Sequence, residues 1–126
     1  EDRPERRSCR RVIVGPDHTI RFSAKGHSFQ NVRITNLNGS GCFAMISPRD
    51  APLFAQGTFL ENFAFEHPDL AAGSIVAKVV YLLGTGSGAP SPEYMGVGIQ
   101  FVSVDADAGA KLERFLARSL KVDSRD

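Results

Sequence analysis

The chain has 126 residues, of which 42% are hydrophobic and 23% are charged. This length and composition are typical of one soluble globular domain and exclude a disordered chain. The formal net charge of +1 argues against a globally basic nucleic-acid-binding protein, and no apolar run approaches the roughly 20 residues of a membrane-spanning helix. Residues 1–5 contain neither a Met nor the apolar core of a signal peptide, so we expect a fragment of a longer protein.

Residues 1–11 carry five arginines against three acidic residues and have no apolar periodicity, which predicts a flexible arm. Arg6, Arg7, Arg10 and Arg11 place four positive charges in six positions, and no lysine occurs before position 25. A guanidinium group binds phosphate through a fork of hydrogen bonds, stacks on flat rings and bonds the O6–N7 edge of guanine. The arm therefore suits a ligand with phosphates and purine bases, although a solubilising tail or a non-specific nucleic-acid patch has the same composition.

Alternation of apolar and polar residues predicts strands through the middle of the chain. The clearest alternation begins at Met95 and includes Phe101, and Gly96 and Gly98 on its second face indicate close approach by another backbone or a barrel corner. Proline and glycine residues indicate a loop at 48–57 and a flexible hairpin loop at 84–92. The six predicted strands lie at about 19–24, 29–37, 42–46, 58–65, 74–83 and 95–102.

Helical spacing replaces this alternation after Asp105, which is the expected N-cap of a C-terminal helix. Six strands closed by one helix predict a mainly β fold, namely a small six-stranded antiparallel β-barrel with one C-terminal α-helix. The expected divisions are an Arg-rich arm at 1–11, the barrel at 12–104, the helix at 105–120 and a tail at 121–126. The apolar residues of the helix are Ala108, Leu112, Phe115, Leu116 and Leu120.

The segment from Asn36 to Gly41 combines two asparagines with two glycines at a predicted strand end. The carboxamides of Asn36 and Asn38 each offer a donor and an acceptor to the edge of a base, and glycine permits close approach of a ligand. The alternative is a plain hairpin turn, because Asn-Gly needs no ligand to form one.

Two cysteines, Cys9 and Cys42, match neither a disulfide framework nor a metal-ligand spacing, and this usage favours a reducing cytoplasm. We expect Cys9 to be a surface thiol and Cys42 a half-buried small hydrophobic residue. The three histidines, His18, His27 and His67, stand beside turn residues and are expected to be solvated. No P-loop, HExxH or GxSxG pattern occurs, so we expect neither an enzyme nor a metal site.

Taken in order, the two polar segments resemble the motifs of a known family. Arg7 and Arg11 form an RxxxR pair, and Asn36 to Gly41 matches a [D/N]xSxxG motif in which Asn38 replaces the usual serine. Together with Gly98–Phe101 and the final helix, they resemble the PilZ domain, a bacterial receptor for the second messenger cyclic di-GMP. Residues 57–65 and 73–81 are similar to the C-terminal domain of YcgR-like flagellar brake proteins, which implies a missing N-terminal domain and a role in flagellar motility.

The resemblance also implies a ligand and a site. The phosphates and guanines of cyclic di-GMP are expected to bind Arg7 and Arg11. One base is expected to contact the barrel through Asn36, Asn38 and Gly41. Arg6 precedes the RxxxR pair, which in the family goes with two nucleotides per domain. Arg10 and Ser40 are secondary site residues. The arm is expected to order on binding, and flagellar motor or pilus proteins are the expected partners.

Two other functions are open at this stage. One is a degenerate PilZ adapter that binds a protein partner without nucleotide, since Asn38 departs from the family motif. The other is a small barrel that binds RNA or DNA. Such barrels stack bases on exposed aromatic residues, whereas Tyr81 and most phenylalanines are predicted to lie in the core and only Tyr94 is an obvious exposed candidate. We therefore expect no DNA or RNA partner and no membrane insertion.

Overall fold

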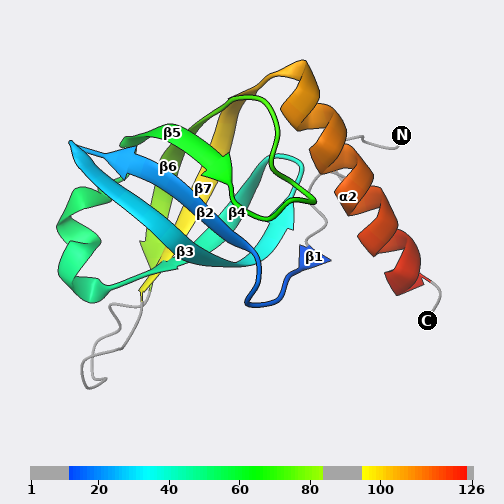
Figure 1. The fold of residues 1–126 in the computed structure, drawn as a ribbon. Helices are drawn as coiled ribbons and strands as arrows, with labels where there is room; N and C mark the ends of the chain where they lie inside the picture. The colour runs from blue at the N-terminus through cyan, green and yellow to red at the C-terminus, as the bar shows by residue number, and fades with distance from the viewer. Residues whose placement is uncertain (1–11, 84–94, 125–126) are drawn as a thin grey trace, which may run out of the picture.

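The computed structural model describes residues 12–83 and 95–124, and it describes side chains as far as Ser119 (Figure 1). The arm at 1–11 and the loop at 84–92 lie outside the described residues. The segment expected as a loop after residue 47 contains one 3-10 helix, η1, which spans Pro48–Leu53 and is capped by Ser47. The other elements are β1 (Val12–Ile13), β2 (Thr19–Ala24), β3 (His27–Asn38), β4 (Gly41–Ile46), β5 (Phe59–Phe65), β6 (Ile75–Leu83), β7 (Met95–Val104) and α2 (Ala106–Ser124).

The strands form one antiparallel sheet that closes on itself. Their order is β1-β3-β2-β5-β6-β7-β4, and β4 also pairs with β3, which completes a ring of six strands from β2 to β7. The short β1 is an additional strand whose one partner among these strands is β3. The predicted mainly β fold, a six-stranded antiparallel barrel with one C-terminal helix, is confirmed.

Irregular residues allow the strands to bend around the barrel. The register of β2 against β3 shifts beside Asn31, and that of β5 against its neighbours shifts beside Asn62. Both asparagines have positive φ, 58° and 55°, which asparagine tolerates better than most residues with a side chain. Such bulges increase strand twist and bending. They let β3 pair with β2 through its first half and with β4 through its second half.

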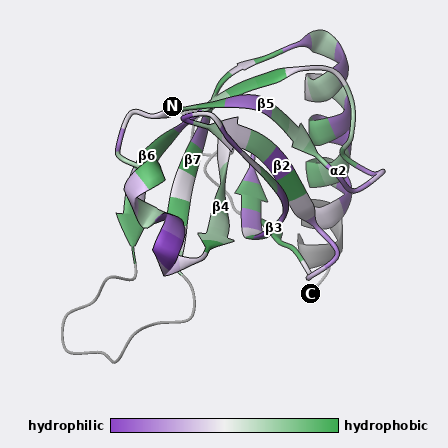
Figure 2. Ribbon diagram, turned by 60° about the vertical axis from the view of Figure 1, so that its left-hand side comes forward, coloured by the Kyte–Doolittle hydropathy of each residue, from purple (hydrophilic) through white to green (hydrophobic). Residues whose placement is uncertain are grey.

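The core follows the predicted alternation. Met95, Val97, Ile99 and Phe101 of β7 are all buried, and Figure 2 shows the alternating hydropathy of this strand. Phenylalanines from β2, β5 and η1's C-cap form much of the remaining core, with Phe22 packed edge-on against Phe54 at 5.8 Å between ring centroids. Tight packing of large side chains against one another gives a small barrel most of its stability.

The helix α2 begins where the sequence predicts and ends later. The Asp105 carboxylate accepts hydrogen bonds from the backbone N–H of Ala108 (2.9 Å) and of Ser74 (2.9 Å), so one N-cap also ties the helix to the segment before β6. Ala108, Leu112 and Phe115 are buried against the barrel. The helix continues to Ser124 and so includes the first four residues of the predicted tail at 121–126.

Beneath α2, two histidines are stacked, contrary to the expectation that they are solvated. The rings of His18 and His67 lie 4.2 Å apart and within 8° of parallel, and Phe115 of α2 lies 5.4 Å from His18. Both ring nitrogens of His18 are buried without a hydrogen-bond partner among the described residues. Burial, and then the nearby His67, lower the pKa of His18, although Asp17 and Asp69 oppose this shift.

This lowered pKa predicts that the fold loses stability in mild acid. Above the ordinary value of 6.5, His18 is neutral in both states and the full stability is present. As the pH falls below 6.5, the unfolded chain takes up a proton that folded His18 resists, so the free energy of unfolding decreases. We expect the melting temperature to drop between about pH 7 and pH 5 by more in the wild type than in a His18→Phe variant. An exposed-site control, His27→Gln, should keep the wild-type drop; equal drops in the wild type and His18→Phe would contradict the prediction.

Candidate functional site

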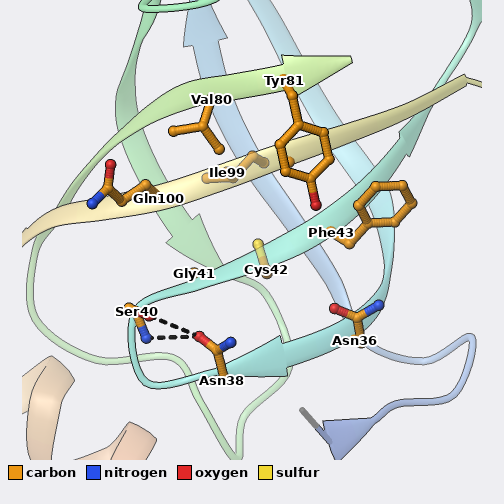
Figure 3. A pocket seen from close by; sticks show the side chains of 11 residues that line it. Asn36, Asn38, Ser40, Gly41, Cys42, Phe43, Val80, Tyr81, Ile99 and Gln100 are labelled. Atoms are coloured by element: carbon orange, nitrogen blue, oxygen red, sulfur yellow. Dashed lines mark hydrogen bonds between the residues drawn. The ribbon is translucent and has the colours of Figure 1, made fainter. Parts of the chain in front are cut away.

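The cavity of interest lies on the outside of the barrel, at the turn between β3 and β4. Its volume is about 210 Å³, and four strands contribute to its lining (Figure 3). All the barrel-side residues predicted for the site, Asn36, Asn38, Ser40 and Gly41, line this cavity. The structure therefore brings together the polar segment that the sequence singles out.

The turn itself is held by the side chain of Asn38. Its Oδ1 accepts hydrogen bonds from the backbone N–H of Ser40 (2.8 Å) and from the Ser40 hydroxyl (3.1 Å). Neither Gly39 nor Ser40 has positive φ, so this is not the mirror-image turn that Asn-Gly most often forms. The backbone N–H of Phe101 also donates to the Ser40 carbonyl at 2.8 Å, which fixes the turn against β7. The Oδ1 acceptor of Asn38 is thus occupied, whereas its Nδ2 has no hydrogen-bond partner among the described residues.

Asn36 lies between β1 and β4, opposite Ile13 on one side and Phe43 on the other. Its side chain is half-buried, and among the described residues its Nδ2 makes one long contact of 3.5 Å, with the Thr35 hydroxyl. Residues 12–83 and 95–119 thus hold the carboxamide of Asn36 only weakly.

Gly41 is required for space and not for backbone conformation. Its φ is not positive, but a Cβ added to it would lie closer than 3.0 Å to the carbonyl oxygen of Ile99 in β7. Gly41 pairs with Gln100 in the β4–β7 ladder, so a side chain here would push two paired strands apart. The close approach that the sequence predicts for this glycine is made by the barrel's own backbone.

Two aromatic side chains, Phe43 of β4 and Tyr81 of β6, also line the cavity. Tyr81 is 40% exposed, so the prediction that it belongs to the core is wrong. Its position results from a register shift between Val79 and Tyr81, where β6 carries one extra residue against β7. A one-residue shift moves the following side chains to the other face. Alternation misplaces Tyr81 because it does not reveal the bulge, and it gives no sign that Phe43 of β4 faces the same cavity.

The glycines of β7 are the signal that points to these rings. A Cβ added to Gly96 or Gly98 would collide with the ring of Phe43 or of Tyr81, respectively. The neighbour that approaches these glycines is therefore an aromatic side chain and not another backbone. Most phenylalanines are expected in the core, but Phe59 of β5 is 54% exposed and does not line the cavity.

Cys42 lies at the bottom of the cavity but is buried, with 7% of its surface exposed. Burial raises the pKa of its thiol far above the ordinary value, which keeps the sulfur protonated and unreactive. Cys42 thus acts as a small hydrophobic residue and is more buried than expected. Cys9 lies outside the described residues.

Arg6, Arg7, Arg10 and Arg11 also lie outside the described residues. The structure does describe where the chain that follows them enters the barrel. Val12 is buried and pairs with Leu37, and Ile13 pairs with Asn36. Val12, which is bonded to Arg11, is therefore paired with β3, the strand that carries Asn36 and Asn38.

Within residues 12–83 and 95–124, no cluster of three or more His, Cys, Asp or Glu side chains has the arrangement of a metal site. The helices among these residues include none with the length and apolarity to cross a membrane.

The family model of the PilZ domain matches residues 5–118. The chain belongs to the PilZ family. The match begins ahead of the RxxxR pair and includes the whole barrel and most of α2. No curated protein matches this PilZ domain.

Solved structures with the same fold are distant in sequence. The apo structure of MrkH from K. pneumonia is 18% identical, with a TM-score of 0.77 over 99% of this chain and 53% of that chain. A MrkH–c-di-GMP complex is also 18% identical, with a TM-score of 0.73 over 92% and 53%. The PilZ domain of YcgR from Escherichia coli, solved with c-di-GMP, is 10% identical, with a TM-score of 0.68 over 92% of each chain. This PilZ domain thus spans about half the length of MrkH.

Proposed function

We propose that this PilZ domain is a receptor for cyclic di-GMP, in which the Arg-rich arm closes over the cavity beside the β3–β4 turn. The observation that carries the proposal is the pairing of β1 with β3, because it fixes the residues that follow the arm beside Asn36. Membership of the PilZ family and the c-di-GMP named in the MrkH and YcgR structures give further support.

The arm and the barrel offer complementary groups to the nucleotide. The guanidinium groups of Arg7 and Arg11 bind phosphates and the guanine edge, with Arg10 in a supporting role. From the barrel, the Asn38 Nδ2 donates, Asn36 offers both a donor and an acceptor, and Ser40 supplies a hydroxyl. Gly41 keeps β4 close enough to β7 for these groups to stay together.

The free energy gained from binding the nucleotide is close to the cost of ordering the arm, so the arm can act as a switch. Each charge-assisted hydrogen bond contributes roughly 1.5–3 kcal/mol, and ordering a residue of the arm costs roughly 1–2 kcal/mol. Two or three such bonds thus approach the cost of ordering about five residues, so the ordered and disordered arms differ little in free energy. Nucleotide binding then orders the arm and reorients whatever precedes it, which a partner protein can recognise. By resemblance to YcgR, we place this output in the control of flagellar motility, with a motor or pilus protein as partner, in the cytoplasm.

The test is a calorimetric titration of the domain with cyclic di-GMP, with GTP as the control ligand, followed by hydrogen exchange of residues 3–11. We expect heat of binding and protection from exchange with cyclic di-GMP and neither with GTP.

Asn38 replaces the family's serine and favours one other candidate function, that of an adapter that binds a protein without nucleotide. That adapter would show neither heat nor a thermal shift with cyclic di-GMP and would still bind a motor or pilus protein.

We expect this titration to give two nucleotides per domain. Arg6 lies immediately before Arg7, where a further guanidinium can neutralise or stack on a second molecule. Arg6→Ala should lower the ratio from two to about one while binding persists. A ratio of one for the wild type, or no difference between the two proteins, would contradict the assignment of Arg6.

A further inference from the structure

The ring of Tyr81 lies flat on the backbone of β7. A Cβ added to Gly98 would be nearly equally close to Cζ, Cε1 and Cε2 of this ring, with all three within 3.0 Å. A point so near three ring atoms at once lies over the face of the ring and not beyond its edge. Gly98 is therefore covered by one face of Tyr81, and any larger residue would lift the ring.

Phe43 also lies against Gly96, with the Cζ end of its ring nearest to a Cβ added there, and its ring centroid lies 6.1 Å from that of Tyr81 at an interplanar angle of 35°. Figure 3 shows the Tyr81 ring reaching from β6 across β7 toward Phe43. We call these two rings the aromatic floor. Tyr81 keeps 40% of its surface exposed, so one face of its ring packs on Gly98 and the other is open to the cavity.

Amide groups surround this floor. Asn36 and Asn38 line the cavity from β3, and the exposed Gln100 lines it from β7. A flat exposed ring binds the face of a nucleobase, and carboxamides bind its edge. The described residues that line the cavity include no Asp, Glu, Lys or Arg, so this half of the site recognises a neutral flat group.

We infer that Tyr81 stacks on a purine base of the bound nucleotide and that Gly98 is a positioning residue that keeps the ring flat. This inference rests on the proposed function, because the purine belongs to cyclic di-GMP. It assigns the base to the barrel and leaves the phosphates to the arginines of the arm.

Tyrosine fluorescence provides a direct test, because the chain contains two tyrosines and no tryptophan. In a Tyr94→Phe variant, Tyr81 is the sole tyrosine. We expect cyclic di-GMP to quench its emission, after correction for nucleotide absorbance, with the same midpoint as the calorimetric titration. Heat of binding without quenching would overturn the inference and leave the receptor function intact. An absence of heat in the wild type would overturn both.

Affinity provides the second test. We expect Tyr81→Ala to weaken binding about tenfold, since a base–aromatic stack contributes on that scale, and Tyr81→Phe to recover most of the loss because it keeps the ring. Gly98→Ala should weaken binding and reduce the quenching amplitude together, which a general loss of stability at an unchanged Tyr81 position would not do. Phe59→Ala, exposed on β5 outside the cavity, is the matched control. Wild-type affinity in a folded Tyr81→Ala variant would refute the stacking role.

Discussion

Replacing Gly41 with alanine is expected to lower the stability of the barrel and its affinity for cyclic di-GMP together. The added methyl group would lie closer than 3.0 Å to the Ile99 carbonyl oxygen, which is backbone and cannot rotate away. Relief requires β4 to move from β7, at a cost of about 1–3 kcal/mol for an overpacked site. The same movement displaces the turn that Phe101 holds through Ser40. We therefore expect at least a tenfold loss of affinity and a lower melting temperature.

Gly39 offers a matched control within the same turn. A Cβ added to Gly39 has no heavy atom within 4 Å, and its φ is not positive. Gly39→Ala should thus leave the melting temperature near that of the wild type and change affinity little. Thermal unfolding and calorimetry of the two variants check the prediction. If both variants behave alike, the steric account of Gly41 is wrong.

Removal of both arginines of the RxxxR pair is expected to reduce affinity more than any other substitution in the arm. Hydrogen bonds to charged groups contribute roughly 1.5–3 kcal/mol each, so Arg11→Ala alone should weaken binding at least tenfold. Arg7→Ala combined with Arg11→Ala should weaken it at least a hundredfold. Because both are charged residues in a segment without apolar periodicity, we expect the melting temperature without ligand to stay the same.

Charge and geometry can be separated at the same position. Arg11→Lys keeps the positive charge but loses the planar fork and the stacking face. We expect its affinity to lie near that of Arg11→Ala, with Arg3→Ala as the control in the same arm. Near-wild-type binding by Arg11→Lys would mean that the arm acts by charge alone, and near-wild-type binding by Arg11→Ala would remove it from the site.

Much of the fold follows from patterns that act locally. Alternation in β7 predicts its buried face because each side chain there faces the core directly, and Asp105 predicts the start of α2 because its carboxylate caps the next turn. The bulge before Tyr81 is not local: it depends on how β6 registers against β7. Sequence alternation therefore assigns Tyr81 to the wrong face.

The candidate site divides in the same way. The segment from Asn36 to Gly41 is contiguous, so its spacing alone indicates that its residues act together. Gln100 and the aromatic floor, by contrast, join the site through strand pairing and a register shift between distant parts of the chain.

The two-residue strand β1 has a mechanical consequence. Among the described strands it pairs with β3, where its partners are Asn36 and Leu37. Tension applied through the N-terminus would peel β1 from β3 before it strained the closed ring of six strands. If the arm binds the nucleotide as proposed, the nucleotide would resist such a pull, and because coupling between two sites is reciprocal, tension on the N-terminal side would lower the affinity for the nucleotide by the same factor.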